Sequence, residues 1–150
     1  MSATKIAASV NEGHTAVNQI RSVRGQTEAI KKRLADDEKA KPIVDAIDTL
    51  NKKLSAIESK IVEPRAKSNE DSLNYPVSVS AQLTILNDTV ESADSAPTKQ
   101  SGEVYAILLE RLNAQLGAWR ELQAKDLPAL NELIMKSNIP PIAPVAEQKK

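Results

Sequence analysis

Apolar residues in the first part of the chain recur at the spacing of helices that bury one face. Over residues 6–34 they advance by alternating steps of four and three, interrupted at positions such as Gly13 and Arg24. A second run, which begins after a short polar turn and Pro42, has no interruption: Ile43, Ile47, Leu50, Leu54, Ile57 and Ile61. Because the connection is short, the two runs predict an antiparallel helical hairpin over residues 6–62.

Residues 77–136 predict a second hairpin. Its shorter helix has apolar residues at Val79, Leu83, Leu86 and Val90, and Pro97 begins the longer helix. The longer helix has a broad apolar face made of Val104, Tyr105, Leu108, Leu109, Leu112, Leu116, Trp119 and Leu122. Pro128 removes a backbone hydrogen bond and crowds the carbonyl of Ala124, so we expect a kink there. We expect Asp126 to cap the restarted helix.

A polar connector without periodicity, residues 63–76, separates the two hairpins. It ends in Leu73-Asn74-Tyr75-Pro76, where the proline cannot continue a helix. Residues 137–150 form a proline-rich extended tail, which is either a strap lying on the helices or a disordered linker end. The pattern therefore predicts an all-α fold: an antiparallel up-and-down four-helix bundle over residues 1–136, followed by this tail.

The composition excludes several classes of function. Lys plus Arg and Asp plus Glu both number 20, so the chain lacks the basic excess that non-specific nucleic-acid binding requires. The absence of cysteine excludes disulfides, thiol catalysis and thiolate metal sites. No stretch approaches the roughly 20 apolar residues of a membrane span, and residues 1–20 lack a signal-peptide run.

The candidate chemical groups favour structural interpretations. His14 is the only histidine, so a di-iron site with two Glu-x-x-His motifs is excluded, and only His14 could serve as the base of a Ser–His–acid triad. Asp36-Asp37-Glu38 is interpreted as a turn and helix cap, and Lys31-Lys32-Arg33 as a solvated face with local ion pairs. Trp119 and Tyr75 are expected to pack in the core. We predict no catalytic residue, cofactor or metal ion.

Five short segments carry a resemblance to a known family: Ile20–Arg24, Leu54–Glu58, Leu73–Val77, Ala96–Tyr105 and Asp126–Asn131. In this order they resemble the C-terminal helical region of bacterial sortilin-like proteins with BNR-repeat β-propellers, which are often labelled glycosyl hydrolases. The resemblance covers roughly residues 15–135. The signature and structural positions are Leu73, Asn74, Tyr75, Pro76, Pro97, Thr98, Gln100, Trp119 and Pro128.

This chain also departs from the family. Ser72 stands where the family usually has a proline, Ser78–Ala81 replaces an Asn-rich stretch, and the propeller repeats themselves are missing. Any hydrolytic residues of such parents would lie in the missing repeats, so none is carried over to this chain.

The resemblance implies a non-catalytic helical accessory domain that contacts a propeller or another protein, located outside the cytoplasm. A cytoplasmic location stays open, because the chain shows no signal peptide. Two alternatives also remain: a free-standing helical adaptor or subunit of a larger assembly, and a fragment of a glycosyl-hydrolase-like enzyme whose catalytic propeller is absent. The oligomeric state is not predicted.

Overall fold

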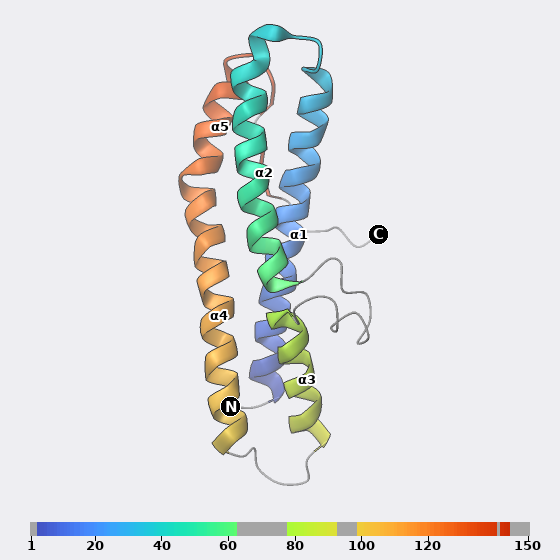
Figure 1. Cartoon of the computed structure of the whole chain (residues 1–150), viewed down its shortest axis with the longest axis vertical. Helices are drawn as coiled ribbons and strands as arrows, with labels where there is room; N and C mark the ends of the chain where they lie inside the picture. The colour runs from blue at the N-terminus through green and yellow to red at the C-terminus, as the bar shows by residue number, and fades with distance from the viewer. Residues whose placement is uncertain (1–2, 63–77, 93–98, 141, 145–150) are drawn as a thin grey trace. The chain divides into compact units, whose positions relative to one another are not determined.

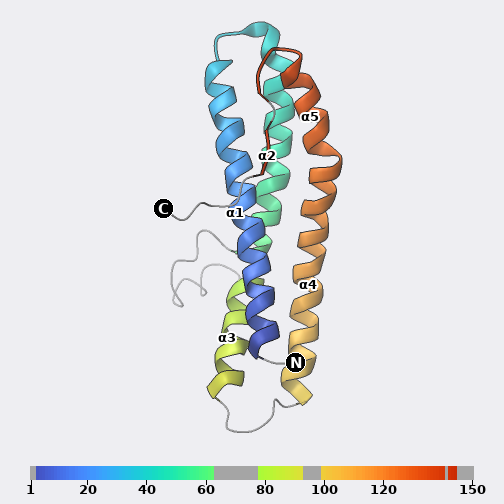
Figure 2. The ribbon, with the colours of Figure 1, turned by 180° about the vertical axis from the view of Figure 1, so that it is seen from behind.

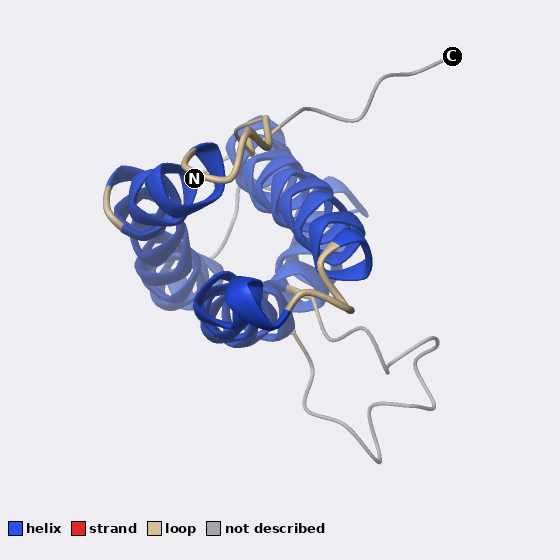
Figure 3. Cartoon of the chain, turned by 90° about the horizontal axis from the view of Figure 1, so that it is seen from above, coloured by secondary structure: helices blue, strands red, loops and turns tan. Residues whose placement is uncertain are grey.

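The computed structural model describes residues 3–62, 78–92, 99–140 and 142–144. Within these residues every regular element is a helix, and Figure 3 shows helices joined by loops without a strand. The elements are α1 (Ala3–Arg33), the 3-10 turn η1 (Glu38–Ala40), α2 (Lys41–Ile61), α3 (Val79–Ser92), α4 (Lys99–Ala124) and α5 (Asp126–Met135). The predicted all-α class is confirmed.

The chain divides into two compact units. Unit 1 comprises residues 1–17 and 58–117, and therefore contains the beginning of α1, the last turn of α2, all of α3 and most of α4. Unit 2 comprises residues 18–57 and 118–150, and therefore contains the rest of α1, η1, most of α2, the end of α4, α5 and the tail.

In unit 1, α1 and α4 run in the same direction. Ser9 contacts Tyr105, and Gly13 lies beside Leu112, so residue numbers rise together along the two helices. Figure 1 shows α3 running in the opposite direction. The buried apolar side chains of this unit are Ile6, Ala16, Val17, Ile61, Val79, Leu83, Leu86, Leu108, Leu112 and Leu116.

In unit 2, α1 and α2 form the predicted antiparallel hairpin. Thr27 pairs with Asn51, and Lys31 pairs with Asp48, so residue numbers rise on one helix as they fall on the other (Figure 1, Figure 2). All six apolar positions predicted for α2 are buried; Ile61 belongs to unit 1 and the others belong to unit 2. The remaining buried apolar side chains of unit 2 come from α1, η1, the α4–α5 segment and the tail: Ile20, Val23, Ile30, Ala40, Trp119, Leu122, Leu127, Leu130, Ile134, Ile139 and Ile142.

The helix ends follow local capping chemistry. The Asp37 carboxylate accepts a hydrogen bond from the Lys39 backbone N–H (3.0 Å) and caps η1, as the interpretation of the acidic turn requires. The Ser78 hydroxyl accepts a hydrogen bond from the Ala81 N–H (3.1 Å) and so caps α3, which begins at Val79. Asp126 does not cap α5, because α5 begins at Asp126 itself after Lys125, which makes no side-chain cap bond.

Three sequence expectations about this arrangement change. An up-and-down order predicts α4 antiparallel to α1, whereas their contacts in unit 1 are parallel. Val104, expected on the apolar face of α4, is 46% exposed because that face centres on Leu108 and Leu112. The long fourth helix is interrupted at Lys125, three residues before Pro128, so α4 and α5 are separate elements.

Candidate functional site

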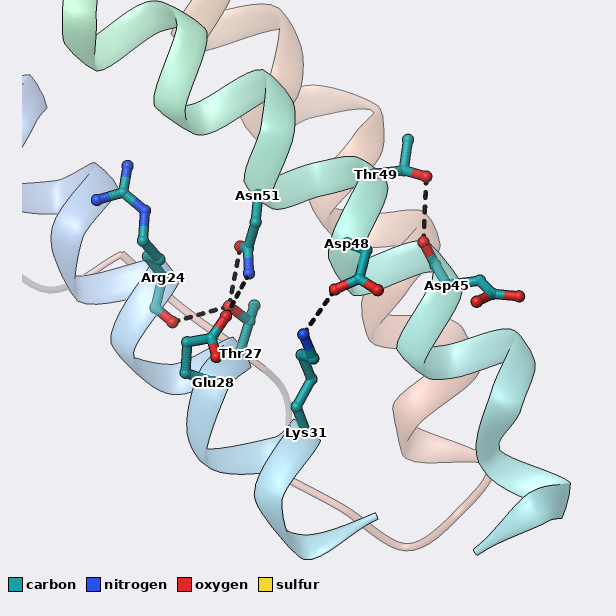
Figure 4. A network of polar contacts seen from close by, with 8 residues as sticks. All are labelled: Arg24, Thr27, Glu28, Lys31, Asp45, Asp48, Thr49 and Asn51. Atoms are coloured by element: carbon teal, nitrogen blue, oxygen red, sulfur yellow. Dashed lines mark hydrogen bonds and ion pairs between the residues drawn. The ribbon is translucent and has the colours of Figure 1, made fainter. Parts of the chain in front are cut away.

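A ladder of polar side chains joins α1 to α2 in unit 2 (Figure 4). The Thr27 hydroxyl, fully buried, shares its one hydrogen between the Arg24 carbonyl (2.8 Å) and Asn51 Oδ1 (3.0 Å). The Asn51 amide then donates to Glu28 Oε1 at 3.0 Å. Each buried polar atom of Thr27 and Asn51 in the ladder therefore has a partner, which fixes the register of the hairpin.

Lys31 extends this ladder toward the end of α1. Its Nζ lies 2.7 Å from Asp48 Oδ1, so it pairs across the hairpin and not with the acidic turn that follows α1. The hydrogen bond that Lys31 donates to Asp48 holds the pKa of Lys31 above its usual value. Charge attraction to Asp48 and Glu28 raises the pKa further, and desolvation opposes the rise. The predicted local ion pair is thus replaced by a contact between helices.

The tail turns back on unit 2 through a capped helix end. The Ile139 N–H donates to the Ile134 carbonyl (3.2 Å) and the Asn138 N–H donates to the Met135 carbonyl (3.0 Å), which is the Schellman arrangement. Asn138 takes the left-handed conformation that this turn needs, with φ of 61°. Ile139 and Ile134 are both buried, as the accompanying apolar contact requires.

Two side-chain amides hold the main chain of the tail. Asn131 of α5 donates to the Ile142 carbonyl (3.0 Å) and accepts from the Ile142 N–H (2.7 Å). Gln26 of α1 donates to the Ala143 carbonyl (2.7 Å) and accepts from the Ala143 N–H (3.3 Å). The strap interpretation of the tail is confirmed for its described residues, and Figure 2 shows it passing between α1 and α5.

In unit 1, His14 Nε2 lies 2.8 Å from Ser80 Oγ, which places a nitrogen base against a hydroxyl. This geometry resembles the nucleophile–base half of a catalytic triad. Ser80 is only 5% exposed, and the two residues lie on α1 and α3 of unit 1. The bond therefore acts as a link between α1 and α3.

Trp119 and Tyr105 both find polar partners on α1. The Trp119 ring is 3% exposed, as predicted for a core residue, and its Nε1–H donates to Gln19 Oε1 at 3.1 Å. The Tyr105 hydroxyl lies 3.1 Å from Ser9 Oγ. Ser9 Oγ also lies 3.1 Å from the Lys5 carbonyl, to which its hydroxyl donates.

Near the start of α5, the Asp126 carboxylate lies 2.6 Å from Lys53 Nζ and joins α5 to α2. Pro128 lies in the first turn of α5, where backbone N–H groups have no partner within the helix, so the lack of an N–H on proline costs no hydrogen bond.

Gln100 is exposed near the start of α4. The other signature positions lie outside the described residues: Leu73, Asn74, Tyr75, Pro76, Pro97 and Thr98.

Sequence reasoning missed the residues that hold the tail. Asn138 had a signal, because asparagine at a helix end followed by Pro140 is typical of a Schellman turn. Gln26 and Asn131 had none, since a polar residue at the edge of the apolar face of a helix gives the same sequence pattern whether it binds water or a distant backbone. The same holds for Gln19, which binds the Trp119 indole.

Among the described residues, no group of three or more His, Cys, Asp or Glu side chains is placed to hold a metal ion. Within the same part of the chain, every helix is too short or too polar to cross a membrane.

No family model, curated protein or solved structure matches this chain.

Proposed function

We propose that the chain is a non-catalytic helical accessory domain that docks on a protein partner, by resemblance the β-propeller of a sortilin-like parent outside the cytoplasm. The observation that carries this proposal is an exposed apolar stripe on α4 in unit 1. Val104 is 46% exposed and Ile107 is 52% exposed, and they lie one turn apart on the same face.

The stripe continues along α4 beyond these two residues. Arg111 and Ala114 follow at steps of four and three residues and are also exposed. Alternating steps of three and four residues place these side chains on one face of the helix, as in helices that pack against a partner. This stripe is offset from the buried face that holds Leu108 and Leu112. Clustered exposed apolar side chains on a helix favour a protein-contact role, with the arginine supplying a polar contact.

We further propose the helix directions within each unit: in unit 1, α1 and α4 run in the same direction, and in unit 2, α1 and α2 run in opposite directions. The contacts of α4 with α1 and of α2 with α1 support these directions, and they replace the simple up-and-down order expected from the sequence. In this arrangement the stripe flanks the core without belonging to it.

The test begins with the coding sequence upstream of Met1. If it continues into propeller repeats, the propeller is expressed separately and its affinity for this chain is measured by calorimetry. The variant Val104→Lys/Ile107→Lys should weaken binding about tenfold or more, because it places two charges in the contact. The matched control Ala106→Lys/Asn113→Lys alters exposed residues on the other side of α4 and should bind normally.

Other results would favour the alternatives. An upstream stop codon, together with a homo-oligomer that the Val104→Lys/Ile107→Lys variant disrupts, would favour a free-standing adaptor. Hydrolysis of model glycosides by the purified chain would contradict the non-catalytic assignment, provided that the activity co-purifies with the chain and disappears on substitution of one of its carboxylates.

A further inference from the structure

We draw no further inference here: the strongest candidate, the exposed apolar side chain of Ile85 on α3 of unit 1 as a second docking surface, carries nothing, because nothing in the described residues shows what covers it.

Discussion

Gly13 of α1 lies so close to Ile61 of α2 that a β-carbon on the glycine would be 3.2 Å from Ile61 Cγ2. The same carbon would be 3.3 Å from Leu112 Cδ1 on α4. Both neighbours are fully buried, so neither side chain can move freely into solvent. The helix interrupts its apolar pattern with glycine at the place where three helices of unit 1 approach closely.

Gly13→Ala and Gly25→Ala should therefore differ although both replacements lie in α1. A β-carbon at Gly25 meets nothing within 4 Å, so this variant should gain about 0.5–1 kcal/mol from the better helix propensity of alanine. At Gly13 the same gain is opposed by overpacking of about 1–3 kcal/mol, and we expect no gain or a loss. Urea unfolding of both variants measures the difference, and equal stabilisation would show that Ile61 and Leu112 yield easily.

Leu54→Ala should reduce the free energy of unfolding by about 2–5 kcal/mol, because Leu54 is fully buried in unit 2. Its neighbour Ser55 is exposed, so Ser55→Ala is the control and should change stability by less than about 0.5 kcal/mol. Chemical denaturation is the measurement. Similar small effects for both variants would contradict the orientation of α2.

Pro128→Ala should be tolerated, with a change in unfolding free energy below about 1 kcal/mol. Pro128 is exposed in the first turn of α5, where helices accept proline without losing an internal bond. The adjacent Leu127 is 5% exposed, and Leu127→Ala should cost about 2–5 kcal/mol. A large loss for Pro128→Ala would mean that the interruption between α4 and α5 is needed for packing.

The bond between His14 and Ser80 should have unequal effects when either side is removed. His14→Ala leaves the buried Ser80 hydroxyl without this partner and should cost about 1–3 kcal/mol. Ser80→Ala leaves an exposed imidazole that water can solvate, so its cost should be nearer 0.5–1.5 kcal/mol, about that of one net hydrogen bond. A double-mutant cycle measures the coupling, and additive effects would show that the bond contributes nothing to stability.

The pairing of Lys31 with Asp48 predicts a loss of stability at high pH. The pKa of Lys31 is raised above its usual value of 10.5 by the hydrogen bond to Asp48, so folding favours the charged form. This contribution is fully present below pH 10.5 and disappears as the pH rises through the raised pKa.

The stability difference between the wild type and Lys31→Met, measured by urea unfolding across this range, should therefore shrink at alkaline pH. Lys52→Met, an exposed position on α2, is the control and should show no such change. A Lys31→Met difference that stays constant above the lysine pKa would contradict the pairing.

The predicted helices were largely right because helical periodicity is a local property. The run from Ile43 to Ile61 is buried at every predicted position, and Ser78 and Asp37 cap the elements they precede. Glycine at position 13 has a poor helix propensity, yet α1 is helical from Ala3. Packing against Ile61 and Leu112 compensates for the poor helix propensity there.

Spacing within single segments was enough to predict the all-helical class, the α1–α2 hairpin and most of the buried faces. Spacing could not predict that α4 runs parallel to α1 in unit 1, that Lys31 binds Asp48, or that Asn131 and Gln26 hold the tail. These are contacts between residues far apart in the chain. A polar side chain carries no local mark of its distant partner, because its choice depends on which helices the whole fold brings together.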